Sequence, residues 1–294
     1  MPIDIPASHL ETPSLGLTAP LHALCFYVAA GITSFGWALC HVLGWTAAPW
    51  MPLWFCAALM IYNVDRLRHD PADALNIPRR DATSARLRGF SLAILAAAAA
   101  TLLALPILRR DWLTLALVVG GSLVCLNYSI PLSGFRFKDV PLLKTLFAPS
   151  VVTAAILGLP LLHEGPPSSS TSFLFIAFRA WLFLIFNMIL CDLRDLAGDR
   201  RTGIRSLPVW LGEKQTRLLL VVLLVIIEAL GLSALALAPP HWVANWRLTC
   251  VLVPLYLGGL LVAVRVPRSE RFYEWSVEGM LFLPAFAILA SNAI

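Results

Sequence analysis

Long apolar segments, separated by short polar connections, dominate this sequence and restrict what it can fold into. Nine segments are long enough, at about 17 to 25 residues each, for a helix to cross the hydrocarbon core of a bilayer. They fall at roughly 23–45, 48–64, 89–108, 112–130, 141–161, 172–191, 215–237, 246–264 and 273–293. Because a backbone in lipid must satisfy its own hydrogen bonds, we expect an all-α polytopic membrane protein of about nine transmembrane helices.

The composition agrees with a lipid bilayer as the main solvent. Hydrophobic residues make up 59% of the 294 and charged residues only 13%, which lies far outside the range of soluble globular proteins. The formal charge of +5 is not arranged as a basic stripe interleaved with aromatics, so we expect no nucleic-acid partner. The six cysteines stand far apart without a CxxC pair, which argues against a zinc site or a disulfide framework.

The distribution of Lys and Arg predicts the orientation in the membrane. Eighteen of the 22 lie in or beside the connections that follow the second, fourth, sixth and eighth segments. Since cytoplasmic loops carry the excess of Lys and Arg, we expect these connections and the N-terminus in the cytoplasm and the C-terminus outside. The chain would be an integral protein of a cell inner or plasma membrane.

Two parts are expected along the chain. Residues 1–20 contain no Lys or Arg, so they lack the basic region of a signal peptide, and we interpret them as a disordered tail. Residues 21–294 would form a single transmembrane helical domain. Because similar acidic clusters recur in both parts of this domain, we expect two pseudo-repeated halves, about 21–161 and 172–294.

Three aspartates at the end of the sixth segment form the most specific polar cluster. Asp192, Asp195 and Asp199 lie at positions i, i+3 and i+7, so they share one face if the helix continues. Carboxylates at membrane depth need a cavity, a partner or an ion, and hard oxygen ligands of this kind suit Mg²⁺ completed by substrate phosphates. The alternative is a solvated helix end whose acids pair with neighbouring arginines. Those arginines are Arg194, Arg200 and Arg201.

A second acidic stretch lies where the second segment meets a basic connection. The sequence IYNVDRLRHDPADALNIPRRD contains Asp65, Asp70 and Asp73. Asp70 and Pro71 are typical of a helix N-cap and first helical position, so we expect the helix to break before Asp73. Two acidic helix ends of this kind favour a shared cavity over a solvated helix end.

The stretch CDLRDLAGDRRTGIRSLPVWLGEKQT closely resembles the second aspartate motif of the UbiA-type membrane prenyltransferases. In that family, D-x-x-D-x-x-x-D precedes a basic loop containing Gly and a Leu-Gly-Glu-Lys turn. NYSIPLSGFRFKDVPLLKTL resembles the family's link between helices four and five, and the hydrophobic plan resembles the family over nearly the whole chain. The resemblance implies a UbiA-like helical bundle around a central cavity.

The first aspartate motif of the family, N-D-x-x-D-x-x-x-D followed by Asn and Pro, is less well matched. Anchored on Asn76 and Pro78, its four marked positions are held by Asp65, Arg66, His69 and Asp73. Only Asp73 keeps the expected residue. Arg66 cannot bind Mg²⁺, and His69, which we interpret as a solvated loop residue, is a poor ligand for so hard an ion. The number of metal ions therefore stays open.

In that family two facing Asp-rich helix ends hold Mg²⁺ ions that bridge the diphosphate of a polyprenyl donor, and the prenyl group passes to an acceptor, usually an aromatic ring. The resemblance implies a Mg²⁺-dependent enzyme of isoprenoid biosynthesis whose partners are a prenyl diphosphate and a hydrophobic acceptor. By motif position, the metal-side residues are Asp65, Asp73, Asp192, Asp195 and Asp199. Asp192 and Asp195 are the expected catalytic pair.

Several further side chains are candidates to bind the diphosphate. Cations suit phosphate oxygens, which singles out Arg66, Lys138, Lys144 and Arg200. Members of the family often carry Tyr-x-x-x-Lys near the fourth helix; here Tyr128 is present, but Leu132 replaces the Lys and Lys138 substitutes for it. Asn63, near the end of the second segment, is the remaining candidate.

Two polar residues lie inside the sixth segment itself. Asn187 and Arg179 are functional candidates by their depth, although we expect Arg179 to snorkel outward and leave it out of the site. Two alternative functions also remain. One is a terpene cyclase that shares the fold and the ionisation step but quenches the carbocation internally, and the other is a non-catalytic membrane transporter or binding protein with a relic site.

Overall fold

The computed structural model describes residues 18–68, 71–131, 134, 136–140, 142–239, 242 and 246–292. Within these ranges the chain is helical, with turns and without a strand, which confirms the all-α prediction. The longer helices are α2 (Phe26–Leu43), α3 (Met51–Leu67), α6 (Arg88–Leu108), α7 (Trp112–Ser129), α8 (Leu143–Glu164), α9 (Ser170–Thr202), α11 (Glu213–Leu237), α13 (Thr249–Ala263) and α15 (Leu283–Asn292). Short helices α1 (Ala19–Ala23), α4 (Pro71–Asn76), α5 (Pro78–Arg86), α10 (Leu207–Leu211) and α14 (Glu270–Phe272) join them.

Each of the nine predicted segments coincides with a long helix of the described chain. Seven of these helices are long and apolar enough to cross a membrane, and the last of them runs over Glu270–Ser291 as one helical segment. The two others, α3 and α13, have 17 and 15 residues. The count of nine membrane crossings therefore stays a prediction, and most of the predicted tail at 1–20 lies outside the described residues.

The helix of the sixth segment continues through the three aspartates, which is the condition for their shared face. With 33 residues, α9 begins after Ser169, whose side chain accepts a hydrogen bond from the backbone of Ser172. It ends at Gly203, which has φ 77°, a left-handed conformation that Gly adopts without strain. Asp192, Asp195 and Asp199 consequently project from the last turns of one unbroken helix.

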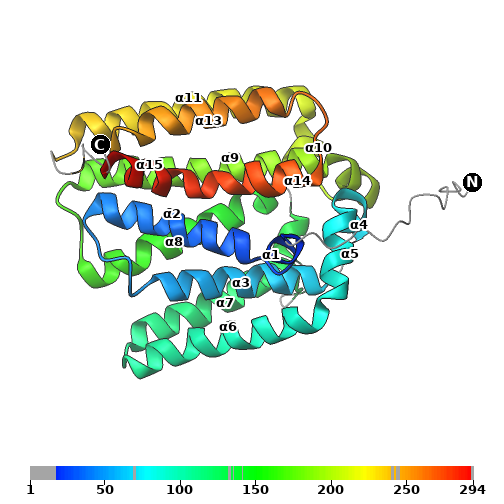
Figure 1. Ribbon diagram of the computed structural model, residues 1–294, viewed down its shortest axis with the longest axis horizontal. Helices are drawn as coiled ribbons and strands as arrows, with labels where there is room; N and C mark the ends of the chain where they lie inside the picture. The colour runs from blue at the N-terminus through cyan, green and yellow to red at the C-terminus, as the bar shows by residue number, and fades with distance from the viewer. Residues whose placement is uncertain are drawn as a thin grey trace, which may run out of the picture.

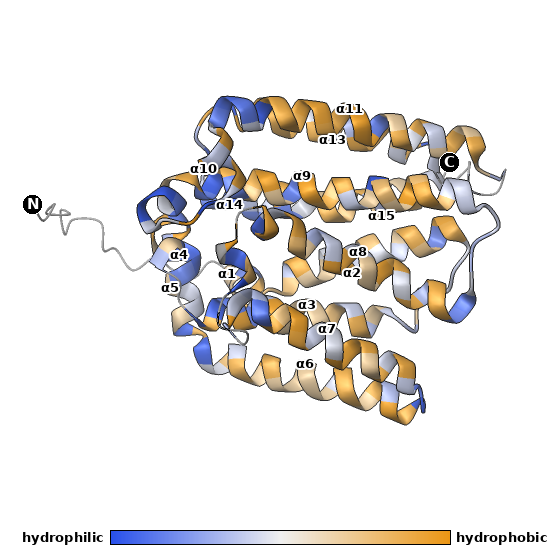
Figure 2. Cartoon of the chain, turned by 180° about the vertical axis from the view of Figure 1, so that it is seen from behind, coloured by the Kyte–Doolittle hydropathy of each residue, from blue (hydrophilic) through white to orange (hydrophobic). Residues whose placement is uncertain are grey.

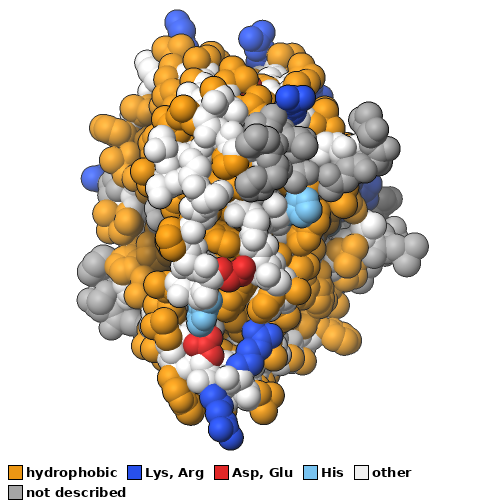
Figure 3. All heavy atoms as spheres, turned by 90° about the vertical axis from the view of Figure 1, so that its left-hand side faces the viewer, with side chains coloured by type: hydrophobic (Ala, Val, Ile, Leu, Met, Phe, Trp, Pro, Cys, Tyr) orange, Lys and Arg blue, Asp and Glu red, His pale blue; other side chains and the backbone are white. Residues whose placement is uncertain are grey.

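Long helices lie roughly alongside one another, and α9 runs through the middle of the bundle (Figure 1). The short helices α4, α5, α10 and α14 gather at one end. Figure 2 shows hydrophilic residues concentrated at this end, whereas hydrophobic residues dominate the long helices. Figure 3 looks onto the opposite end, where hydrophobic side chains cover the flanks. The connections predicted to be cytoplasmic thus share one end; which side of a membrane this end faces stays a prediction.

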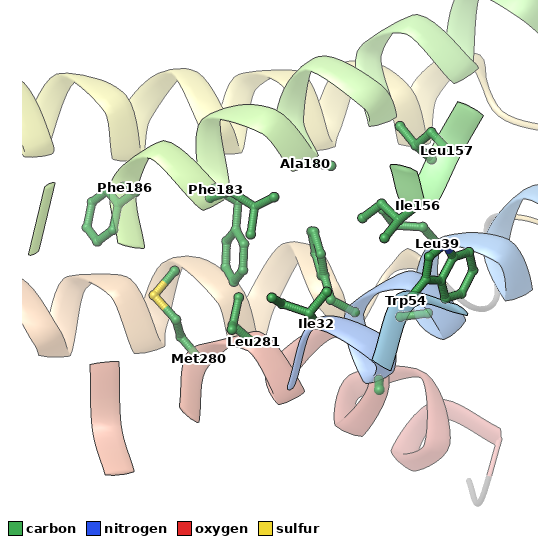
Figure 4. Packing of buried hydrophobic residues seen from close by; sticks show 14 of the residues in the cluster. Ile32, Leu39, Trp54, Ile156, Leu157, Ala180, Phe183, Phe186, Met280 and Leu281 are labelled. Atoms are coloured by element: carbon green, nitrogen blue, oxygen red, sulfur yellow. The ribbon is translucent and has the colours of Figure 1, made fainter. Parts of the chain in front are cut away.

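The core between the first, sixth and last of the predicted segments is built from large apolar side chains. Figure 4 shows Phe183 and Phe186 of α9 among Ile32 of α2 and Met280 and Leu281 of the last helical segment. These side chains are all buried, and their packing holds α9 against both neighbours. The rotation of α9 that this packing imposes decides which of its polar residues face the interior.

Candidate functional site

A cavity of about 550 Å³ lies inside the bundle, and its two ends differ in chemistry. At the end near the short helices it is lined by carboxylates and cations, while the remainder is lined mainly by apolar side chains of α3, α7 and α8. Along α8 the lining runs from Lys144 to Leu162, a helical rise of roughly 27 Å. The cavity therefore combines a polar pocket with a long apolar extension.

One side of the polar pocket is the α9 wall, formed by Asp192, Arg194, Asp195 and Asp199. The Lys144 ammonium, from α8, lies 2.7 Å from Asp199 Oδ2 and 3.3 Å from Asp192 Oδ1, so one cation serves two acids. Thr145 Oγ1 donates a hydrogen bond of 2.8 Å to Asp192 Oδ2. Asp192 and Asp199 are each only 1% exposed. These two acids are thus turned into the cavity, which contradicts the alternative of a solvated helix end.

The third acid of the α9 wall has a cation of its own. Arg194 donates from Nε and Nη2 to the two oxygens of Asp195, at 2.7 and 3.0 Å. The same guanidinium lies over the ring of Tyr273, 5.6 Å from its centroid. Arg194 and Asp195 both line the cavity. This pairing places one forked cation and one carboxylate side by side in the lining of the pocket.

The opposite side is the α3–α4 wall, formed by Asp65, Arg66 and Asp73. Asp65 Oδ1 accepts hydrogen bonds from Ser129 Oγ at 2.7 Å and from Lys138 Nζ at 3.1 Å. Arg66 Nη1 lies 3.4 Å from Asp73 Oδ2. All three residues of this wall line the same cavity as the α9 wall. The two acidic helix ends therefore face one pocket, as their sequence similarity predicted.

The α3 helix breaks before Asp73, as the Asp70-Pro71 pair predicted. It ends at Leu67, and α4 begins at Pro71, where a proline without an N–H fits the first helical position. His69 and Asp70 fall outside the described residues. Asp65 and Asp73 are consequently carried by two separate helices rather than by one stripe.

A contact missed by the sequence analysis holds α4 against α9. The Gly198 backbone N–H donates a hydrogen bond of 2.8 Å to Asn76 Oδ1. A Cβ atom at Gly198 would lie 2.2 Å from that oxygen, so only Gly allows the approach. The contact joins the helix of Asp73 to the helix end of Asp199. The Asn that follows the first acidic motif and the Gly inside the second were its signals in the sequence.

The last helical segment also contributes to the pocket, and no motif had pointed to it. Glu278 lines the cavity and pairs with Arg80 of α5, Nη1 to Oε1 at 2.5 Å. Glu270 accepts from the backbone N–H groups of Arg79 and Arg80 at 3.1 Å each, at the start of α5. An ion pair between Arg79 and Glu274 adds to the same contact. These pairs tie the connection that carries Asp73 to the C-terminal part of the bundle.

The structure brings most of the predicted site residues together. Nine of them line the cavity, namely Asp65, Arg66, Asp73, Tyr128, Lys138, Lys144, Asp192, Asp195 and Asp199. Tyr128 stacks on Phe147 with ring centroids 5.4 Å apart, and both rings face the cavity.

Two predicted diphosphate-binding residues lie elsewhere. Asn63 is fully buried and donates from Nδ2 to the backbone oxygens of Leu24 and Leu59, at 3.1 and 2.9 Å, so it joins α3 to the start of the bundle. Arg200 is exposed, because it lies one residue past Asp199 and therefore on another face of α9. The structure does not place either residue on the cavity.

The expectation that Arg179 snorkels outward is wrong. Arg179 is 5% exposed and donates from Nε to the Ile227 backbone oxygen at 3.1 Å. Its guanidinium lies over the Trp246 ring, 4.8 Å from the centroid. Packing of α9 against α11 and α13 supplies the partners that the sequence did not show. Asn187, in contrast, lines the cavity and donates to the Val277 backbone oxygen at 2.7 Å, beside a π-helical turn at Tyr273–Val277.

Burial and charge act on the one site acid that lies outside the long helices. Burial raises the pKa of the Asp73 carboxyl above its ordinary value, while the Arg66 guanidinium opposes this shift and lowers the pKa. The negative charge of Asp65 adds to the increase. An additional anion that binds at the α3–α4 wall therefore needs positive charge nearby to compensate its own.

The donor set of the pocket fits Mg²⁺ when substrate oxygens take part. Within the described ranges, no three His, Cys, Asp or Glu side chains are grouped so that they could hold a metal ion by themselves. Mg²⁺ does not require such a cage, because it keeps several waters and is usually bound by one or two carboxylates plus substrate phosphates. Asp192, Asp195 and Asp199 provide hard oxygen ligands in a partly closed pocket, which is the chemistry that the ion prefers.

Comparisons with known proteins agree with this architecture. A sequence profile described as the UbiA prenyltransferase family matches residues 71–282. The fold is similar to that of a UbiA homolog from Archaeoglobus fulgidus bound to GPP and Mg²⁺, with a TM-score of 0.66, 16% identity, and coverage of 95% of this chain and 99% of that one. A complex of a UbiA homolog from the same organism with DMAPP and Mg²⁺ has a TM-score of 0.65, 16% identity and the same coverage.

A UbiA homolog from Aeropyrum pernix K1, solved in its apo form, is similar as well. The TM-score is 0.65 and the identity 15%, over 92% of this chain and 98% of that one. No curated protein sequence matched this chain. At these identities the structural similarity establishes the shared fold, and the match of the family profile over most of the chain establishes the relationship.

Proposed function

This chain belongs to the UbiA prenyltransferase family, and from this premise we propose that it is a Mg²⁺-dependent intramembrane prenyltransferase. It would ionise a prenyl diphosphate and transfer the prenyl group to an aromatic or other lipid-soluble acceptor. The observation that carries the proposal is the single cavity with a charged pocket at one end and a long apolar extension at the other. A prenyl diphosphate is divided in the same way, with a charged diphosphate at one end and an apolar hydrocarbon tail at the other.

The α8 lining explains why a prenyl chain fits the extension. Val151, Ala155, Gly158 and Leu162 face the cavity along successive turns below Lys144, and none of them carries a polar side chain. Burying apolar surface stabilises a bound hydrocarbon by about 25 cal/mol per Å². The acceptor would approach from the same apolar surroundings, which suits a lipid-soluble molecule.

Cations of the pocket are suited to hold the diphosphate oxygens. Lys144 contacts the α9 wall, Lys138 contacts the α3–α4 wall, Arg66 belongs to that second wall, and all three line the cavity. Ammonium and guanidinium groups form short, charge-assisted hydrogen bonds with phosphate oxygens. Mg²⁺, held by carboxylates of the α9 wall, would supply further positive charge to the leaving diphosphate. The complexes of the Archaeoglobus fulgidus homolog with GPP or DMAPP and Mg²⁺ support this assignment.

Aromatic rings next to the charged pocket suit a developing allylic cation. The rings of Tyr128 and Phe147 stack on each other at the cavity surface, and Lys144 and Asp65 line the same cavity. The faces of such rings attract positive charge, and the apolar lining beyond them limits the access of water. Transfer to an acceptor rather than hydrolysis is the expected outcome in such surroundings.

The proposal is tested with purified protein in detergent. Prenyl diphosphates of increasing chain length are supplied with Mg²⁺, and release of diphosphate is measured with and without aromatic acceptors and after chelation of the metal. Release that requires both Mg²⁺ and an acceptor supports the transferase. Release without an acceptor, with a cyclic hydrocarbon or alcohol as product, would instead assign the chain as a terpene cyclase. No release with any donor contradicts both activities and favours a non-catalytic member.

A further inference from the structure

The two walls of the charged pocket differ in their balance of charge. Among the described residues that line the cavity there are six carboxylates and five cations. On the α3–α4 wall the two acids contact different cations, Asp65 with Lys138 and Asp73 with Arg66. Glu278 is likewise matched by Arg80. The one formal negative charge that remains uncompensated therefore belongs to the α9 wall.

The α9 wall is short of one cation because Lys144 is shared. Its ammonium contacts both Asp192 and Asp199, at 3.3 and 2.7 Å, while Arg194 is engaged with Asp195. Three carboxylates of one helix stripe, two of them buried, thus contact two cations. Like charges held this close favour binding of an additional positive ion, and hard oxygen donors favour a small divalent one.

The α3–α4 wall lacks this shortage of cations and instead carries a guanidinium that faces the cavity. Its position 66 holds a guanidinium, which carries no lone pair for a metal and keeps its charge at any accessible pH. The Arg66 side chain is 12% exposed, lines the cavity, and makes a long contact of 3.4 Å with Asp73. A planar fork of donors that is held only loosely by its counter-ion matches the oxygens of a phosphate.

We propose that this chain holds the diphosphate with one Mg²⁺ on the α9 wall and with the Arg66 guanidinium on the α3–α4 wall, where no second ion binds. The inference rests on the proposed function, since it concerns how the same pocket holds the same substrate group. Arg66 thereby contributes the positive charge that a second ion would otherwise bring to that wall. One divalent ion added to the uncompensated charge of the pocket leaves the lining positive and receptive to an anion.

The number of bound ions is measured directly, without turnover. Purified protein is titrated with Mn²⁺ in the presence of inorganic diphosphate, and free Mn²⁺ is followed by electron paramagnetic resonance. The expected result is one tightly bound Mn²⁺ per chain. Two tightly bound ions, or none, would overturn the inference.

Two substitutions at the same position sharpen the test. Arg66→Gln removes the guanidinium without adding a metal ligand, so we expect one Mn²⁺ still to bind and the affinity for diphosphate to fall roughly tenfold to a hundredfold. Arg66→Asp adds a carboxylate to a wall that has lost its cation, and we expect it to bind a second Mn²⁺. Unchanged diphosphate affinity in the first variant would contradict the role of Arg66.

The matched control is Arg86→Asp, the same substitution in the same connection. Arg86 is exposed at the end of α5 and does not line the cavity. We expect the Arg86→Asp variant to bind one Mn²⁺. A second ion in this control would mean that added surface charge, not the pocket, accounts for the second ion bound by Arg66→Asp. Failure of the inference is distinct from failure of the function: a chain that turns over prenyl diphosphates but binds two Mn²⁺ refutes only the inference.

Discussion

The two acidic helix ends that meet at the cavity are similar in sequence and different in structure. On the α9 wall the helix is unbroken, and the side chains of Asp192 and Asp199 are each 2% exposed. On the α3–α4 wall the helix stops at Leu67, and the side chains of Asp65 and Asp73 are 30% and 24% exposed. The continuous helix gathers its acids on one stripe, where Lys144 contacts two of them, whereas the broken helix separates Asp65 and Asp73, which contact different cations.

This difference predicts different roles for the two walls. The α9 wall has the surplus of negative charge that attracts a divalent cation, and the α3–α4 wall has matched pairs whose cations face the cavity. The walls also differ in what holds them in place. The helix α4 contacts α9 through Asn76 and Gly198, and α5, which follows it, is paired with Glu278 through Arg80. Substitutions on the two walls should therefore differ in size and in kind.

The largest effect is expected on the α9 wall. Asp192→Asn or Asp195→Asn removes a negative oxygen ligand at nearly constant shape, and we expect diphosphate release to fall by about 10²- to 10³-fold. Release is measured in detergent at saturating Mg²⁺. Glu213→Gln, at an exposed acid paired with Arg217 on α11, is the control and should retain full activity. Equal turnover in the Asp variants and the control would remove the α9 wall from the mechanism.

The next effect is expected where the two walls touch. Gly198→Ala introduces a Cβ that must displace Asn76, so α4 has to move and carry Asp73 away from the pocket. Overpacking of this kind destabilises by about 1–3 kcal/mol, and we expect a lower unfolding temperature together with roughly tenfold slower diphosphate release. Gly120→Ala, which meets nothing within 4 Å, is the matched control. If both Gly variants behave alike, the contact does not position the wall.

A smaller effect is expected for the acid of α4. Asp73→Asn should slow diphosphate release by less than about tenfold, because this wall already pairs its acids with cations. Burial raises the pKa of Asp73, so the folded protein retains its proton to higher pH than the unfolded chain. The native protein should therefore lose stability relative to Asp73→Asn as pH rises through the raised pKa. Below the ordinary value of 3.8 the carboxyl is protonated in both the folded and the unfolded chain, so the difference in stability should no longer change with pH.

Thermal unfolding in detergent at several pH values measures that difference. A gap in unfolding temperature that stays constant with pH, or that widens toward acid, would contradict the role of burial at Asp73. The release assay provides the second comparison. A loss as large as that of the Asp192 variant would mean that the two walls hold the substrate in the same way.

The smallest effect is expected for a cation that lies next to the α9 wall but outside the cavity. Arg200 is exposed, so Arg200→Gln should change diphosphate release by no more than about twofold. Lys144→Gln makes the same change of charge inside the pocket and leaves Asp192 and Asp199 without their shared cation. We expect it to slow release by at least tenfold, so similar results for the two variants would contradict the geometry of the wall.

Much of this architecture follows from local sequence patterns. The positions of the long helices follow from runs of apolar residues, and the shared face of Asp192, Asp195 and Asp199 follows from their spacing on a helix that contains no proline. The break between α3 and α4 follows from the Asp-Pro pair. Each of these inferences depends on residues that are close in sequence, where helix geometry and proline chemistry act regardless of the rest of the fold.

Other features of the site depend on residues far apart in the chain. The Arg80 pair with Glu278 joins positions 198 apart, and the inward position of Arg179 depends on carbonyl groups of α11 and α13. Asn63 is a predicted diphosphate-binding residue, yet on α3 its side chain is turned toward Leu24, to whose backbone oxygen it donates. No local pattern reports how a helix is rotated against its neighbours.

From its residues alone this chain could be predicted to be a helical membrane protein with two acidic helix ends and a resemblance to a known family. This was possible because hydropathy, helical spacing and motif identity are properties of contiguous residues. Only the packed helices show which acids share a cation, which arginines face the cavity and, among the described residues that line it, which wall has more acids than cations. The physical reason is that ion pairing and burial depend on the packing of whole helices, which brings together atoms that are distant in the sequence.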